Sequence, residues 1–210
     1  MVQWSGPEDL DLDTLLPPFR ATDPAVRWLF GLERLGMRPG LERIEALLEG
    51  CGRPERAYPS VVVAGTNGKG TAATYLAALG RAAGRRTGLY TSPHFLRVHE
   101  RILVDGRPIG EPALRDLIEE LRPAAEELGA TFFETVTAMA LLHYAREGVD
   151  LAVLETGLGG RLDATNAVPA VGALLTSVGA DHQHVLGESL AEIATEKLGL
   201  AKAGRPFYLG

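Results

Sequence analysis

The sequence predicts an α/β protein of three layers, with helices on both faces of a mostly parallel β-sheet. Short apolar runs such as "SVVVA" (60–64) and "VDLAVLE" (149–155) have the valine- and leucine-rich composition of strands that are buried on both faces. Longer segments with helical periodicity separate these runs. Because parallel neighbours need a crossover connection, strands that alternate with helices indicate a parallel sheet.

Two helices are predicted ahead of the first strand, after an acidic and turn-rich beginning of the chain. The first helix lies within 23–36, where Asp23 suits the N-cap and Pro24 suits the first turn, in which its missing N–H is not needed. The second helix lies within 40–52. The next predicted elements are a strand, a glycine-rich loop and a helix, at 61–64, 65–71 and 71–84.

The remaining elements continue the alternation. Asp105 and Gly106 tolerate the positive φ of a tight turn, so 100–109 is predicted to form a hairpin. Ser189 and Glu192 predict a capping box at the start of the last helix. The other predicted elements are strands at 85–92, 149–157, 170–179 and 205–210, and helices, each ended by a glycine, at 111–129 and 133–148.

The composition bounds the class of protein. The 210 residues carry a net charge of -6 and are 46% hydrophobic, which is enough for one sizeable core. The mild acidity argues against a nucleic-acid partner, because such a partner needs a basic patch. Cys51 is the single cysteine, the first residues do not resemble a secretory signal, and no apolar run approaches about 20 residues. We expect a soluble, cytoplasmic, monomeric protein that binds small molecules and no membrane.

The segment 60–80, "SVVVAGTNGKGTAATYLAALG", predicts a phosphate-binding loop between a strand and a helix. Glycines let backbone N–H groups close around an anion, the lysine adds positive charge, and the threonine hydroxyl can bind magnesium. An ordinary glycine turn is the alternative interpretation. We expect a P-loop NTPase-like domain that binds ATP through Gly65, Thr66, Asn67, Gly68, Lys69, Gly70 and Thr71.

Three polar residues lie at or just beyond the C-terminal ends of predicted strands: Ser92, Glu155 and His182. Open α/β sheets collect their ligands at that edge, and hydroxyl and carboxylate oxygens suit magnesium, although imidazole is a less usual partner. Each residue also has an ordinary interpretation, as a turn serine, a glutamate paired with Arg161 and a capping histidine. The residue types alone therefore do not decide whether these residues form a magnesium site.

Lys197 lies on a predicted helix face that is otherwise apolar. Its neighbours at helical spacing are Leu190, Ile193, Ala194 and Ala201. Desolvation on such a face disfavours the ammonium form of a lysine and makes its amine nucleophilic. The alternative, which the sequence alone favours, is that the side chain extends its ammonium group into water.

Five segments, in order, resemble the folylpolyglutamate synthase/dihydrofolate synthase family of the Mur-ligase superfamily. They are "AGTNGKGT", "LYTSPHFLRVHERI", "FFETVTAMAL", "LETGLGGRLDATNAV" and "DHQHVLGESLAEIATEKLGLAKAGRP". The resemblance runs from about Gly40 to the end of the chain and implies the fold of the Mur-ligase central domain. It also implies that 1–210 is an incomplete N-terminal ATP-binding domain, and that the C-terminal glutamate-ligase domain is absent from this chain.

The resemblance implies roles for individual residues. Ser92, Glu155 and His182 would hold magnesium, and the loop chemistry adds Thr71 to them. Lys197 would be carbamylated and serve a second magnesium ion, and Lys69, Lys197 and His182 would be the catalytic residues. The implied pterin-binding residues are Thr131, Phe132, Phe133, Glu134, Leu162, Asp163, Ala164, Arg38, Pro39 and Gly40. By packing alone, Phe132 and Phe133 could equally be core residues.

The implied activity is that of an ATP-dependent ligase. It would join L-glutamate to dihydropteroate, to a folate polyglutamate or to both, through an acyl phosphate, and the 210 residues alone would be inactive. Such chemistry needs positioning and charge neutralisation more than a general base. The alternatives are a Mur-type amino-acid ligase of cell-wall synthesis, a plain P-loop ATPase and a non-catalytic nucleotide-binding fragment.

Overall fold

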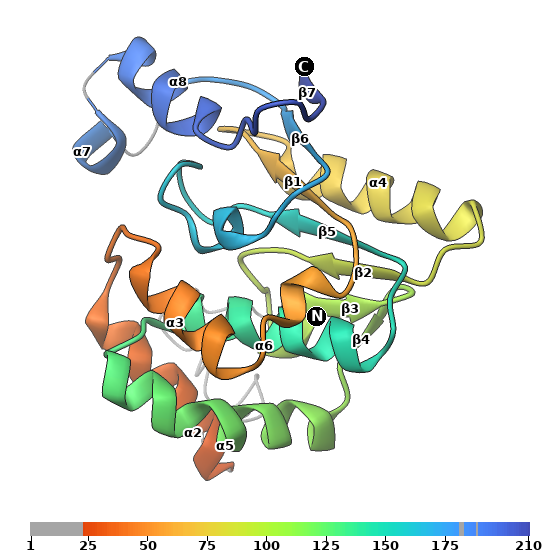
Figure 1. The fold of residues 1–210 in the computed structure, drawn as a ribbon. Coiled ribbons are helices and arrows are strands. Elements are labelled where there is room, and N and C mark those ends of the chain that lie inside the picture. Colours follow the sequence, from red (N-terminus) through yellow and green to blue (C-terminus); the bar gives the residue numbers. More distant parts are fainter. Residues whose placement is uncertain (1–22, 181–182, 188) are drawn as a thin grey trace, which may run out of the picture.

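The computed structural model describes residues 23–180, 183–187 and 189–210, which form a seven-stranded sheet (Figure 1). From one edge to the other, the strands are β4 (Arg107–Pro108), β3 (Ile102–Val104), β2 (Thr87–Tyr90), β5 (Leu151–Glu155), β1 (Ser60–Ala64), β6 (Gly172–Leu175) and β7 (Phe207–Leu209). Neighbours from β2 to β7 pair in parallel, whereas β3 pairs antiparallel with both β2 and β4. The predicted α/β fold with a mostly parallel sheet is confirmed.

Helices cover both faces of the sheet, so the fold has three layers (Figure 1). The helix α4 lies on one face, and α2, α3, α5 and α6 lie on the other, while α7 and α8 lie beside the edge formed by β6 and β7. The helices are α2 (Pro24–Gly31), α3 (Glu42–Gly50), α4 (Lys69–Ala82), α5 (Glu111–Leu128), α6 (Phe132–Arg146), α7 (Gln183–Leu186) and α8 (Leu190–Leu198).

Alternate side chains of the central strand β1 enter two different hydrophobic clusters. Val62 and Ala64 belong to the large cluster that includes α6, whereas Val63 packs with Ala73 and Ala77 of α4. This alternation follows from the two-residue period of a strand. It also explains why the run of apolar residues in β1 is continuous, since both faces are covered.

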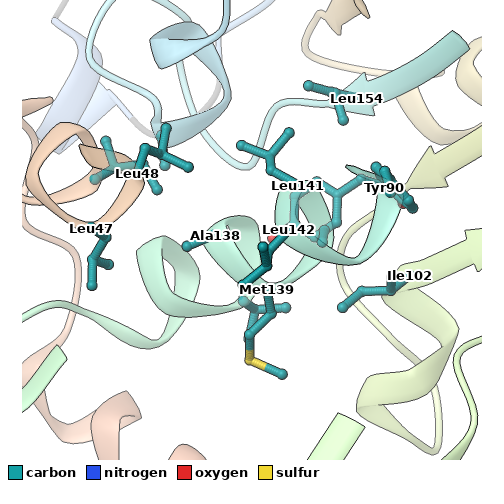
Figure 2. Close-up of a cluster of buried hydrophobic side chains, with 14 of the residues drawn as sticks. Leu47, Leu48, Tyr90, Ile102, Ala138, Met139, Leu141, Leu142 and Leu154 are labelled. Atoms are coloured by element: carbon teal, nitrogen blue, oxygen red, sulfur yellow. The ribbon is translucent and has the colours of Figure 1, made fainter. Parts of the chain in front are cut away.

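The large cluster is built around α6, which is buried over most of its length. Figure 2 shows Met139, Leu141 and Leu142 of this helix between α3 and the sheet. The partners that it labels are Leu47 and Leu48 of α3, Tyr90 of β2, Ile102 of β3 and Leu154 of β5. Because Thr131 is the N-cap of α6 and Phe132 is its first residue, this core fixes the position of two predicted pterin-binding residues.

Most predicted helix and turn signals are confirmed. The Asp23 carboxylate accepts a hydrogen bond from the Ala25 amide at 2.8 Å, and Ser189 and Glu192 form the predicted capping box. Asp105 and Gly106 adopt φ angles of 51° and 78° in the turn between β3 and β4. The prediction of one helix within 23–36 is wrong in its second half, where the chain tightens into the 3-10 turn η2 (Leu32–Leu35). No helix in the described residues is long and apolar enough to cross a membrane.

Candidate active site

The predicted phosphate loop connects the end of β1 to the start of α4. Gly65 has a φ of 152°, and a Cβ at that position would overlap the Thr176 hydroxyl, so only glycine fits there. The Lys69 ammonium folds back over the loop and donates to the carbonyl oxygens of Gly65, at 3.0 Å, and Thr66, at 3.4 Å. The loop therefore holds its lysine at the N-terminus of a helix, where an anion is stabilised.

Residues just after β6 support this loop, a contribution that sequence reasoning missed. The Asn67 amide donates to the Ser177 hydroxyl at 3.0 Å, and the Thr176 hydroxyl donates to the Asn67 carbonyl at 2.6 Å. The Gly179 amide donates to the Thr66 hydroxyl at 2.9 Å. The signal in the sequence was a pair of polar side chains directly after an apolar strand. They reach the loop because β6 pairs in parallel with β1, so both strands end at the same edge of the sheet.

Glu155 joins the phosphate loop to the segment that follows β2. Its side chain is buried, with 4% of the residue exposed, and one carboxylate oxygen accepts the Ser92 amide at 3.0 Å. Burial raises the pKa of Glu155, and the Ser92 amide and the charge of Lys69 partly oppose that shift. A Cβ on Gly70 would lie 3.3 Å from the same oxygen, Glu155 Oε2. Gly70 thus lets the loop lie against the carboxylate.

Three other residues were predicted as magnesium ligands: Thr71, Lys197 and His182. Thr71 directly follows Gly70 in the first turn of α4 and is exposed. Lys197 is buried on α8, with 4% of the residue exposed, which excludes the alternative of an ammonium extended into water. The apolar face predicted for it is only partly buried, because Leu190 is 56% exposed and Ala201 lies beyond the helix. His182 lies outside the described residues. Within residues 23–180, 183–187 and 189–210, no three His, Cys, Asp or Glu side chains form a metal-binding group.

A cavity of about 520 Å³ lies next to Ser92. Its wall brings together the three segments that were predicted to bind a pterin, although they are far apart in the sequence. The lining includes all ten predicted residues: Arg38, Pro39, Gly40, Thr131, Phe132, Phe133, Glu134, Leu162, Asp163 and Ala164. Ser92 lines the same cavity, so a ligand there would lie beside the residue that contacts Glu155.

The two phenylalanines of the cavity are held by other rings. Phe132 stacks on Phe30, with ring centroids 5.5 Å apart, and the guanidinium carbon of Arg101 lies 5.2 Å from its ring centre. Phe133 lies 5.9 Å from the Tyr90 ring. Both rings thus belong to the core and to the cavity wall, so the two interpretations of these residues are compatible.

Glu134 builds the cavity wall through bonds within the protein. Its carboxylate accepts from the Thr131 amide and hydroxyl, both at 2.8 Å, and this caps α6. Arg43 approaches both carboxylate oxygens, at 3.1 Å and 3.0 Å, and also donates to the Arg38 carbonyl. Arg43, which sequence reasoning missed, therefore connects two parts of the cavity wall.

Replacing Arg43 with Met should destabilise the protein by about 2 kcal/mol, because it leaves the Glu134 carboxylate buried without its cation. Denaturant unfolding measures this free energy. Arg146→Met is the matched control, because Arg146 pairs with Glu120 at 2.7 Å and both side chains are nearly half exposed. We expect the control to lose less than about 1 kcal/mol. Equal losses in the two variants would contradict the importance assigned to the buried pair.

Comparisons with known proteins show which proteins this chain resembles. No protein-family model matches it. It is 48% identical over 191 residues to the probable bifunctional folylpolyglutamate synthase/dihydropteroate synthase of Haloferax volcanii, a match that covers 89% of this chain and 23% of the relative. It is 39% identical over 195 residues to the dihydrofolate synthase/folylpolyglutamate synthase of Bacillus subtilis, covering 90% and 45%. The solved structure of Escherichia coli FolC in complex with DHPP and ADP matches with a TM-score of 0.84 and 38% identity, covering 90% of this chain and 46% of that one.

The chain belongs to the folylpolyglutamate synthase/dihydrofolate synthase family. It spans less than half the length of the curated relatives that it matches. A solved FPGS–AMPPCP–folate complex also matches, with a TM-score of 0.84 and 38% identity, and covers 89% of this chain and 47% of that one. The predicted family and the predicted fold are therefore confirmed, and the family's solved structures include complexes with nucleotide and with folate.

In this member of the family, the loop after β5 is docked on the helix that carries Lys197. The Arg161 amide donates to the Glu196 carbonyl at 2.8 Å, and its guanidinium pairs with the Glu196 carboxylate at 2.7 Å. The sequence had suggested Glu155 as the partner of Arg161, and that alternative is wrong. Asn166 Nδ2 donates to the Arg161 carbonyl at 2.8 Å. The cavity wall and α8 are thus fixed to each other.

Asp163 holds the same loop in shape. Its carboxylate accepts from the amides of Leu158 and Thr165, both at 2.9 Å, and from the Thr165 hydroxyl at 2.6 Å. Burial raises the pKa of Asp163, and these hydrogen bonds oppose the shift. An acid at the start of the 3-10 turn η5 (Ala164–Ala167) was a readable cap signal, although sequence reasoning assigned Asp163 only to a ligand.

Proposed function

We propose that the protein containing this chain is an ATP-dependent ligase that joins L-glutamate to dihydropteroate, to folates or to both. One observation carries the proposal: Glu155 lies beside the phosphate loop, at Gly70, and accepts a hydrogen bond from the amide of Ser92, which lines the cavity. A carboxylate substrate in the cavity would therefore lie next to a nucleotide in the loop. The relatives bear the matching names, and FolC was solved with DHPP and ADP.

The described residues fit ATP and magnesium. The glycine loop would surround the phosphates with backbone N–H groups, and Lys69 would neutralise part of their charge. The oxygen donors near the loop are hard ligands of the kind magnesium prefers, and Glu155 is a buried carboxylate whose charge a cation would stabilise. We propose two magnesium sites, served by Thr71, Ser92, Glu155, His182 and a carbamylated Lys197. Bound magnesium would offset the charge of the transferring phosphate.

The proposed reaction forms two bonds in succession, and neither step changes an oxidation state. The substrate carboxylate attacks the γ-phosphorus of ATP, which gives an acyl phosphate and releases ADP. The glutamate amine then attacks the acyl carbon, releases phosphate and loses a proton. The chain's own residues contribute position and charge: the cavity orients the carboxylate, and Lys69 stabilises the phosphate. No side chain of the described residues is assigned as a general base.

We further propose that these residues form the ATP- and pterin-binding part of a monomeric, cytoplasmic enzyme. The relatives are more than twice as long, so residues outside this chain would complete the glutamate site. The 210 residues alone are then expected to be inactive. Dihydropteroate or folate and L-glutamate would be the partners, with no nucleic acid and no membrane.

The test uses the full-length gene product with ATP, magnesium and L-glutamate. One reaction receives 7,8-dihydropteroate and another a reduced folate, and the products are weighed by mass spectrometry. A gain of one glutamate residue in the first reaction indicates dihydrofolate synthase, in the second folylpolyglutamate synthase, and in both a bifunctional enzyme. ATP hydrolysis with no mass gain would overturn the proposal and favour a plain ATPase.

A further inference from the structure

Three arginines line the cavity, and they differ in burial and in pairing. Arg38 is exposed and donates to the Gly129 carbonyl at 3.3 Å, and Arg161 is exposed and paired with Glu196. Arg101 is buried, with 8% of the residue exposed. In the part of the chain that the structure describes, no carboxylate lies within 4.0 Å of its guanidinium. Arg101 is therefore the one buried cation of the described cavity wall that lacks an acidic partner.

Neutral groups hold Arg101 in place. Its Nε donates to His94 Nδ1 at 2.8 Å, which requires that nitrogen to be unprotonated, and its guanidinium lies over the Phe132 ring. An imidazole acceptor and a ring face position the arginine but do not neutralise its charge. Since a buried charge without a counter-charge in direct contact is costly, an anion in the cavity would be stabilised at this place.

The chemistry of Arg101 suits a carboxylate. A guanidinium presents parallel N–H donors that match the two oxygens of a carboxylate, and such charge-assisted pairs are strong. The arginine lines the same cavity as Ser92, whose amide donates to Glu155, and Glu155 lies beside Gly70 of the phosphate loop. The carboxylate that reacts with ATP must approach that loop.

We propose that Arg101 binds the carboxylate of the pterin substrate and so positions its reacting end. This inference rests on the proposed function. It assigns to the pair His94–Arg101 a role in recognition: His94 orients the guanidinium, and the guanidinium distinguishes an acid from an otherwise identical uncharged molecule. The aromatic and backbone surfaces of the cavity, in contrast, recognise the uncharged rings.

The test compares two ligands by equilibrium binding to the full-length protein without ATP. One is 7,8-dihydropteroate, and the other is the same molecule with hydrogen in place of the carboxylate. We expect the wild-type protein to prefer the acid by about 10- to 100-fold, the usual range for a hydrogen bond to a charged group. Arg101→Gln should abolish that preference while keeping its affinity for the uncharged ligand. Arg101→Lys should keep part of the preference, and Arg107→Gln, at an exposed arginine of β4, should keep all of it.

The ratio of the two dissociation constants separates the possible failures. If Arg101→Gln weakens both ligands equally, Arg101 is structural and the inference is wrong. If Arg101→Gln does not fold, an unchanged ratio in Arg101→Lys would overturn the inference as well. If the wild-type protein binds neither ligand, the proposed pterin function fails, whatever the variants do. The binding ratio does not depend on catalysis, so a loss of turnover alone cannot imitate the expected result.

Discussion

Lys69→Met should reduce ATP-dependent ligation by the full-length protein by at least about 100-fold, the range seen when a single charge-stabilising group is removed. The methionine keeps most of the side-chain volume but removes the ammonium that lies over the loop, 3.0 Å from the Gly65 carbonyl. The positive charge is then missing where the phosphate charge is greatest. Affinity for ATP, measured by equilibrium titration, should fall together with turnover.

Arg85→Met is the control for this change, because Arg85 is an exposed residue between α4 and β2. Its activity should match that of the wild-type protein. Turnover retained in Lys69→Met would show that backbone N–H groups and the helix N-terminus suffice for phosphate binding. The loop would then not carry the function that its sequence predicts.

Glu155→Gln should abolish magnesium-dependent ligation and yet stabilise the protein in the absence of nucleotide. Burial raises the pKa of Glu155 in the folded protein, so the charged form is disfavoured there. This cost is absent below the pKa of the unfolded chain and complete above the folded pKa. The unfolding temperature of the variant should therefore exceed that of the wild-type protein at neutral pH, and the difference should shrink as the pH falls from the raised folded-state pKa of Glu155 to the ordinary pKa of a glutamate.

Adding ATP and magnesium should reverse this order, because a bound cation stabilises only the wild-type carboxylate. Thermal unfolding with and without the two ligands measures both effects. Glu127→Gln, at an exposed position of α5, is the control and should follow the wild-type curve in both conditions. Equal stabilisation of Glu155→Gln by magnesium and ATP would exclude Glu155 as a magnesium ligand.

Local signals in the sequence were sufficient for the secondary structure near the site. The valines of β1, the glycines that follow them and the alanine-rich α4 predict a strand, a loop and a helix from neighbouring residues alone. The caps at Asp23 and Ser189 act over two or three residues and were equally readable. The 3-10 turn after α2 was not predicted, because helix tightening depends on packing as well as on helical periodicity.

The sequence predicted the burial of Lys197 only in part. Its helical spacing predicted an apolar face, and the lysine is buried, but Leu190 on the same predicted face is largely exposed. A periodic pattern defines one side of a helix but not which turns another segment covers. Here the loop of Arg161 contacts the end of α8 and leaves its beginning exposed.

The sequence by itself determined the α/β fold, the phosphate loop and the family resemblance, because each depends on residues that are adjacent or regularly spaced. The tertiary structure decided three further features. Gly70 lies against Glu155, Arg43 connects Glu134 to the Arg38 carbonyl, and Arg101 is buried in the cavity without an acidic partner among the described residues. Each joins segments that are distant in the chain. Pairing across such distances is set by how the layers pack, and a pattern of single residues does not contain that information.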